Sequence, residues 1–132
     1  MMSYFEQDMI KAQDGEAQAM VSVGIKLRQG TMVQQNLTQA IVWFTRAMKL
    51  GNVDAMIELG IMYSKSGNAE DACRMYYKAL EKGSAIAPFN LAVMMEDNRI
   101  ISTKQMIIEY YIRAANLGHY GAMNNLAQLY KK

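Results

Sequence analysis

Residues 15–51 read GEAQAMVSVGIKLRQGTMVQQNLTQAIVWFTRAMKLG, and the pattern in this stretch returns along the rest of the chain. The stretch begins and ends on a glycine, 36 residues apart. Two further glycines, Gly83 and Gly118, continue the series after spacings of 32 and 35 residues. An internal repeat with a period of roughly 20–50 residues is typical of solenoid proteins.

Each glycine of this series is followed by small and large apolar residues at fixed distances. An alanine lies four residues after it, valine or leucine eight residues after it, and glycine or alanine nine residues after it. Because these offsets share one face of a helix, they predict an amphipathic helix with room for a close neighbour. The residues at offsets four and nine are Ala19, Ala55, Ala87 and Ala122, and Gly24, Gly60, Ala92 and Ala127.

The residues before each glycine indicate a second helix in each repeat. A pair of large residues and then an alanine precede the last three glycines, and the pairs are Trp43-Phe44, Met75-Tyr76 and Tyr110-Tyr111. The glycine itself fits the end of that helix, where the backbone turns left-handed. Each repeat is therefore a helical hairpin that must stack on a neighbour to bury its apolar face. The predicted helices span residues 4–13, 16–29, 37–50, 53–65, 69–82, 86–97, 103–117 and 120–131.

The length of 132 residues predicts a single domain. Two of its predicted helices begin after a good capping residue, which is Asn36 in one case and either Ser102 or Thr103 in the other. We expect an N-terminal helix within residues 1–14, full repeats over 15–50, 51–82 and 83–117, and half a repeat over 118–132.

The composition excludes several classes of protein. Hydrophobic residues make up 52% of the chain and charged residues 20%, which is incompatible with an intrinsically disordered protein. A single cysteine excludes a disulfide framework, and no apolar run is long enough to span a membrane. The net charge of +2 favours neither a nucleic-acid nor a membrane partner. Residues 1–18 lack the apolar segment of a secretory signal peptide, so we expect a cytoplasmic protein.

The repeat resembles the Sel-one-like repeat, a branch of the tetratricopeptide superfamily. The first unit carries the motif of that family best, at Ala19, Val23-Gly24, Leu27, Gly30, Val33, Asn36, Gln39-Ala40, Trp43-Phe44, Ala47 and Gly51. The second unit has a shorter loop, and the loop of the third, residues 98–104, departs from the motif. The resemblance implies an all-α solenoid of about seven or eight antiparallel helices that form a right-handed superhelix.

The same resemblance implies a non-catalytic scaffold or adaptor that binds a helix or peptide of another protein and needs neither cofactor nor metal. Such repeats are packing motifs, often found in bacteria and in signalling or secretion systems, so they bring no catalytic residues with them. A regulatory or cognate-inhibitor protein that acts through dimerisation is the alternative. A hydrolase-like enzyme is a further alternative, which no nucleophile–base pair in the sequence supports.

Few side chains in the sequence are chemically reactive. Cys73 occupies a position that isoleucine holds in the neighbouring repeats, which predicts a buried and inert thiol. His119, the only histidine, is expected at the surface at the start of a helix. The absence of a cysteine and histidine cluster excludes a zinc site. Methionines at one repeat position fit either core packing or an adaptable binding surface, and they are Met20, Met56 and Met123.

The resemblance also places the first helix of each unit on the concave side of the solenoid, at offsets 3, 6, 10, 13 and 14 from the glycine. Offsets 6 and 10 hold six large apolar side chains in two adjacent rows, which is more than a solvent-lined groove would carry. We therefore expect a protein-binding groove. The alternative is that a tightly curled solenoid packs these rows on each other or on the N-terminal helix. The candidate residues are Val21, Ile25, Arg28, Ile57, Ile61, Lys65, Phe89, Val93, Glu96, Asn124 and Gln128.

The C-terminal face is the second expected interaction surface. The fourth unit stops at Lys132 after its first helix, so no second helix follows to cover Met123, Leu126 and Tyr130. We expect this face to form a homodimer or to dock a partner protein. Nucleic acid is not expected as a partner, because no helix carries a basic stripe.

Overall fold

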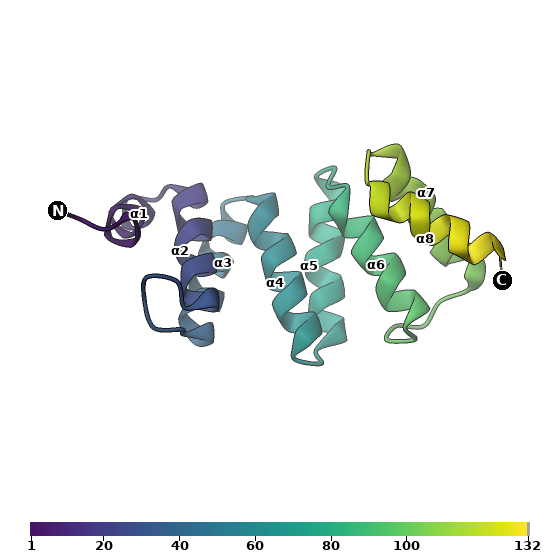
Figure 1. The fold of residues 1–132 in the computed structure, drawn as a ribbon, viewed down its shortest axis with the longest axis horizontal. Helices are drawn as coiled ribbons and strands as arrows, with labels where there is room; N and C mark the ends of the chain where they lie inside the picture. The colour runs from purple at the N-terminus through teal and green to yellow at the C-terminus, as the bar shows by residue number, and fades with distance from the viewer. Residues whose placement is uncertain (132) are drawn as a thin grey trace. The chain divides into compact units, whose positions relative to one another are not determined.

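The structure, a computed structural model, describes residues 1–131 and folds them into eight α-helices (Figure 1). Lys132, the last residue of the predicted half repeat, lies outside the described residues. The all-α fold predicted from the repeat is confirmed. The helices are α1 (Tyr4–Gln13), α2 (Ala17–Gln29), α3 (Leu37–Lys49), α4 (Val53–Lys65), α5 (Ala69–Glu81), α6 (Ile86–Glu96), α7 (Lys104–Asn116) and α8 (Tyr120–Lys131).

The predicted helix boundaries agree with the observed ones to within one residue at every end. The differences lie mostly at C-terminal ends. Leu50, Lys82 and Asp97 were predicted as last helical residues, but their ψ values of 4°, 7° and 6° end the helix one residue earlier. Each of them is a C-cap residue, which is only half helical. The sequence pattern therefore overestimates the length of these helices by one residue.

Local side-chain caps fix where several helices begin. Asn36 precedes α3 and its side-chain oxygen accepts the N–H of Gln39 at 3.0 Å, as predicted. Thr103, rather than Ser102, caps α7, because its hydroxyl oxygen accepts the N–H of Met106 at 3.2 Å. A side-chain cap of this kind stabilises a helix by about 1 kcal/mol.

The glycine that recurs in each repeat ends the second helix of the hairpin. Gly51 follows the C-cap residue of α3 with a φ of 88°, and Gly118 follows that of α7 with a φ of 98°. Both values lie in the left-handed region, where a Cβ would clash with the following carbonyl oxygen. The repeating glycines are therefore explained by the turn that each hairpin needs before the next helix.

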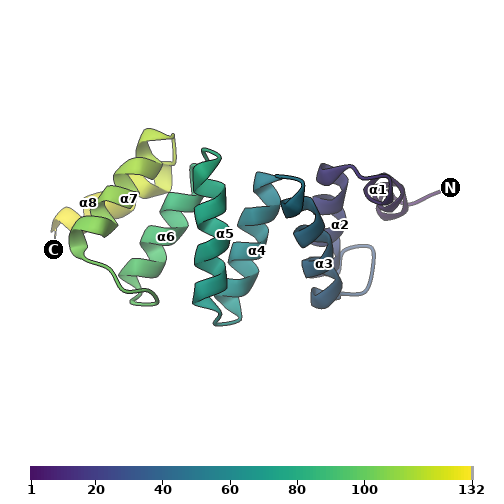
Figure 2. The same ribbon diagram turned by 180° about the vertical axis from the view of Figure 1, so that it is seen from behind.

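Contacts divide the described chain into two compact units, an N-terminal unit from Met1 to Leu59 and a C-terminal unit from Gly60 onwards. In the N-terminal unit, α2 and α3 form a helical hairpin (Figure 2). Gly24 of α2 lies against the ring of Phe44 in α3, and a Cβ on this glycine would come within 2.6 Å of the ring. The missing side chain therefore creates the space that the aromatic ring fills. The expectation of a single domain stays a prediction.

The N-terminal helix is held to the first hairpin by polar contacts. The carboxylate of Asp8 in α1 accepts hydrogen bonds from the hydroxyl of Ser22 at 2.6 Å and from the ammonium of Lys26 at 2.5 Å, both in α2. Partial burial opposes ionisation of this carboxyl group, but the two donors outweigh it and lower the pKa of Asp8 below its usual value. Asp8 is thus a charged link between α1 and α2.

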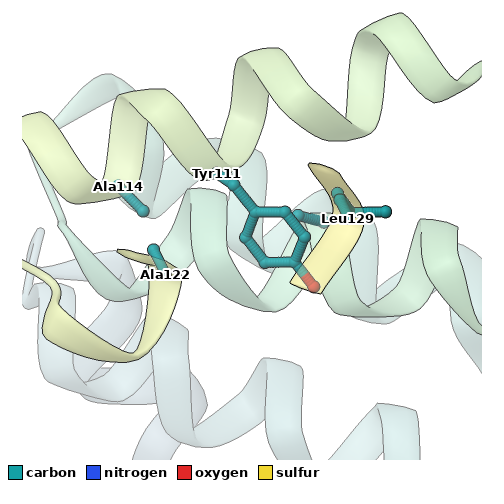
Figure 3. Packing of buried hydrophobic residues seen from close by; sticks show 5 residues of the cluster. Tyr111, Ala114, Ala122 and Leu129 are labelled. Carbon is teal, nitrogen blue, oxygen red and sulfur yellow. The ribbon is translucent and has the colours of Figure 1, made fainter. Parts of the chain in front are cut away.

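The C-terminal unit repeats the same packing device. Gly60 of α4 lies against the ring of Tyr76 in α5, and a Cβ on this glycine would come within 2.8 Å of the Cδ1 atom of that ring. Farther along, Tyr111 and Ala114 of α7 face α8 in a buried cluster (Figure 3). The other buried members are Ala92, Ala122 and Leu129. These contacts join α6, α7 and α8.

Candidate functional site

The apolar residues of the predicted groove differ in exposure. Val21 and Ile57 are buried, at 1% and 7% exposed, whereas Ile25 and three others remain part-exposed. Those three are Ile61, Phe89 and Val93, all in the C-terminal unit. Val21 and Ile57 are therefore closed to a ligand in the described chain, and the part-exposed residues of the C-terminal unit are the ones that a partner could reach.

Four of the predicted residues meet in one surface hollow of the C-terminal unit. Ile61 and Lys65 come from the end of α4, and Phe89 and Val93 come from α6, where they are one helical turn apart. This α4–α6 hollow has a volume of about 230 Å³. Its remaining lining residues are Ser64, Tyr76, Asn90, Met94 and Arg99. That the hollow is a protein-binding site stays a prediction.

Five lining residues are absent from the predicted groove, and Arg99 is the charged one among them. It lies in the loop between α6 and α7, and its guanidinium donates to the hydroxyl oxygen of Ser64 at 2.5 Å and to the backbone carbonyl of the same residue. This carbonyl is at the C-terminal end of α4, where a cation is favoured by the helix dipole. The loop is therefore tied to α4, and Arg99 forms one edge of the hollow.

Residues of α7 and of the turn before α8 pack against the ring of Phe89. Its ring stacks on that of His119 with centroids 4.1 Å apart and an interplanar angle of 20°. Tyr111 contacts the same ring at a centroid distance of 5.9 Å. The predicted place of His119 at a helix start is correct, but the imidazole is part-buried rather than at the open surface.

His119 also caps α8, which leads to a test of this contact. Its Nδ1 atom accepts the N–H of Ala122 at 3.1 Å. We expect His119→Ala to lower the free energy of unfolding by about 2 kcal/mol, because both the cap and the ring stack are lost. His119→Asn should recover part of the stability by restoring the cap, and urea unfolding of the three proteins measures it. Equal stability of all three would contradict the role of His119.

Two of the three charged residues of the predicted groove, Arg28 and Glu96, are engaged within the described chain. Arg28 forms an ion pair with Glu58, with its Nη2 atom 3.0 Å from a carboxylate oxygen. Glu96 accepts a hydrogen bond from the hydroxyl of Tyr111, which is fully buried. Burial and this carboxylate raise the pKa of Tyr111 well above its usual value. Neither Arg28 nor Glu96 lines the α4–α6 hollow; both hold helices of their own unit together.

The two polar positions predicted on α8 lie apart from this hollow. Asn124 and Gln128 are exposed and do not line it. The predicted C-terminal face is partly open in the described chain: Met123 is 46% and Tyr130 66% exposed, whereas Leu126 packs against the buried cluster. Self-association through this face stays a prediction.

Cys73 differs in burial from its prediction. It is half-buried rather than buried, and it lines a second surface hollow together with Tyr77, Arg99 and Ile101. Burial raises the pKa of the Cys73 thiol, although the charge of Arg99 opposes the shift. A raised pKa leaves less of the nucleophilic thiolate. Within residues 1–131 no hydrogen bond joins Cys73 to His119, and no group of three potential metal ligands occurs.

None of the eight described helices is both long and apolar enough to cross a membrane.

Comparisons with known proteins agree with the repeat. The Sel1 repeat family matches residues 15–52, 53–84 and 108–119. A protective antigen of uropathogenic Escherichia coli with an SLR fold superimposes with a TM-score of 0.88 and 31% identity, over 98% of this chain and 29% of the antigen chain. A Sel1 repeat protein from Oxalobacter formigenes gives a TM-score of 0.86 at 23% identity, over 96% of this chain and 54% of that chain.

Two curated proteins share shorter stretches of sequence with this chain. The ERAD-associated E3 ubiquitin-protein ligase component HRD3 of Candida glabrata is 41% identical over 59 residues, which is 45% of this chain and 7% of that protein. An F-box protein of Arabidopsis thaliana is 30% identical over 79 residues, which is 59% of this chain and 22% of that protein. The chain therefore spans less than a quarter of either relative.

Three observations agree with one another. The helices form hairpins, small residues face buried aromatic rings, and the family model matches the repeats. Sel1 repeats generally mediate protein–protein interactions, and they are typically non-catalytic scaffolds. The chain belongs to the Sel1 repeat family, within the group of tetratricopeptide-like helical repeats.

Proposed function

We propose that this chain is a non-catalytic scaffold that binds another protein, and that the α4–α6 hollow receives an apolar side chain from a helix or extended segment of that partner. The observation that carries the proposal is the meeting of Ile61, Phe89 and Val93, all apolar and part-exposed, around one hollow. Such binding supports an adaptor role in the cell. The alternative is a regulatory or cognate-inhibitor protein that acts through dimerisation.

The size and lining of the hollow favour a side chain over a small molecule. Its volume of about 230 Å³ is below the range of about 300–1,000 Å³ that is usual for ligand pockets. Burying the exposed parts of three apolar side chains contributes at most about 1.5–3 kcal/mol each, less the cost of ordering the partner. That is the scale of a hot spot at the centre of a protein interface.

The lining offers little for catalysis. Among the described residues around the hollow there is no histidine, carboxylate or thiol, so the commonest catalytic bases of a hydrolase are missing there. The nearby His119 imidazole is stacked on Phe89 and its Nδ1 atom is occupied by the cap of α8. The hydrolase-like alternative thus receives no support from this site.

We expect Val93→Glu to weaken partner binding at least about tenfold, because it places a charge in the apolar centre of the contact. Val93 is chosen over Ile57 because it is part-exposed. It also packs against the buried cluster around Tyr111, so the variant should lose some stability but keep its helicity, which circular dichroism checks before binding is compared. The measurement compares proteins captured from the source cells by the wild type and by the variant, with quantification by mass spectrometry.

Val42→Glu is the matched control. Val42 is 44% exposed on α3 in the N-terminal unit and does not line the hollow. The control should therefore capture the same proteins as the wild type. If Val93→Glu folds normally and still captures every protein that the control captures, the proposed site is wrong.

A further inference from the structure

We propose that Lys65 and Arg99 make the α4–α6 hollow selective for an acidic protein segment, in which an aspartate or glutamate lies next to the apolar side chain that enters the hollow. This inference rests on the proposed function, because it names the chemistry of the partner at the same site. Its occupant is a peptide segment rather than a small anion, since the hollow is lined mainly by apolar side chains and carries two cations.

The charged side chains that line the hollow all have the same sign. Of the described residues around the hollow, Lys65 and Arg99 are cationic and none is anionic. The ion pairs found in residues 1–131 use Lys26, Arg28 and Arg74, so neither cation of the hollow is neutralised by a carboxylate. The two positive charges are therefore available to a partner.

The contrast with other charged residues of the predicted groove strengthens this point. Arg28 is paired with Glu58, and the carboxylate of Glu96 accepts a hydrogen bond from the hydroxyl of Tyr111. Each of these charged groups has a partner within its own unit. Lys65 is exposed and has no such partner in the described chain, and Ser64 binds Arg99 only through neutral oxygen atoms.

Arg99 is held in place before a partner arrives. A guanidinium has five N–H donors, and two of those on Arg99 bind Ser64, which leaves the others for an incoming carboxylate. Because the side chain is already ordered, it loses less conformational entropy on binding than a free arginine would. A carboxylate that reaches both cations would then add electrostatic selectivity to the binding that the apolar contact provides.

The test is a selection from a phage-displayed library of random peptides on the immobilised full chain. We expect the enriched peptides to carry an aspartate or glutamate beside a large apolar residue. The same selection on Lys65→Glu should lose this preference for acidic residues. Lys82→Glu is the matched control, because it also reverses the charge of an exposed lysine at the end of a helix, but outside the hollow.

A second measurement uses one enriched peptide and its counterpart with glutamine in place of each acidic residue. We expect the acidic peptide to bind the wild type about 3- to 10-fold more tightly, as two solvent-exposed ion pairs would give. Fluorescence anisotropy at low and high salt should show the advantage shrinking with added salt, because exposed charges are screened.

The outcomes separate this inference from the proposed function. Enrichment of apolar peptides without acidic residues, lost in Val93→Glu, would overturn the charge selection and leave the hollow as a binding site. Acidic enrichment that persists in Lys65→Glu as it does in Lys82→Glu would also overturn it. Peptides that bind Val93→Glu as tightly as the wild type would overturn both proposals. The absence of any enriched peptide would also overturn both.

Discussion

Replacement of Tyr111 by alanine is expected to lower the free energy of unfolding by about 4 kcal/mol. The side chain is fully buried among Ala92, Ala114, Ala122 and Leu129, so its removal leaves a cavity that four small or rigidly placed neighbours cannot fill. The loss is a large share of the roughly 5–15 kcal/mol that stabilises an ordinary domain. Urea unfolding followed by circular dichroism measures it.

Two further variants separate packing from hydrogen bonding at this residue. Tyr111→Phe keeps the ring but removes the hydroxyl group that bonds Glu96 and Asn125, and should cost about 1.5–3 kcal/mol. Tyr120→Ala is the surface control, because that tyrosine is 79% exposed and its truncation should change stability by no more than about 0.5 kcal/mol. If Tyr111→Ala costs no more than this control, the C-terminal core is wrongly described.

The same variants predict a dependence on alkaline pH. Burial and the Glu96 carboxylate raise the pKa of Tyr111 in the folded chain above its unfolded value near 10. The unfolded chain then releases this proton at a lower pH than the folded chain does, so stability falls as the pH rises above 10. Tyr111→Phe should lose less stability than the wild type over that range, because this tyrosine no longer contributes.

The fold could be predicted because its signals are local and repeated. Small residues at one offset and aromatic residues at another return in every hairpin, and Gly24 with Phe44 and Gly60 with Tyr76 are the contacts that they encode. Helix ends followed from caps such as Asn36 and from glycines in the left-handed region. Repetition lets each of these weak local signals be read several times in one sequence.

The site was predicted less completely, because exposure depends on what covers a side chain. Offsets along a helix place Ile57 and Ile61 on neighbouring positions of one face, yet the first is buried and the second is part-exposed. Glu96 was expected to belong to the groove, but a hydroxyl from the next helix binds it. Arg99 lies in a loop that lacks the repeat pattern, so nothing local connected it to Ser64.

Enlargement of Gly60 to leucine is expected to lower the free energy of unfolding by about 3 kcal/mol, at the upper end of the range for overpacked cores. Even a Cβ at this position would come within 2.8 Å of Tyr76, so the ring or one of the two helices must move. Leucine favours a helix over glycine by about 1 kcal/mol, so the cost of overpacking must exceed this gain before the variant is destabilised. Gly60→Ala should therefore be destabilised less than Gly60→Leu, and thermal and urea unfolding compare the two.

Lys65→Leu supplies the control for the leucine itself, because it adds the same side chain at an exposed position of the same helix and should change stability by no more than about 0.5 kcal/mol. The contact with Tyr76 is tested by adding Tyr76→Ala to Gly60→Leu. The truncated ring leaves space for the leucine, so the two substitutions together should cost clearly less than the sum of their separate costs. Simple additivity would show that Gly60 and Tyr76 do not pack against each other, and the hairpin register on which the α4–α6 hollow depends would then be wrong.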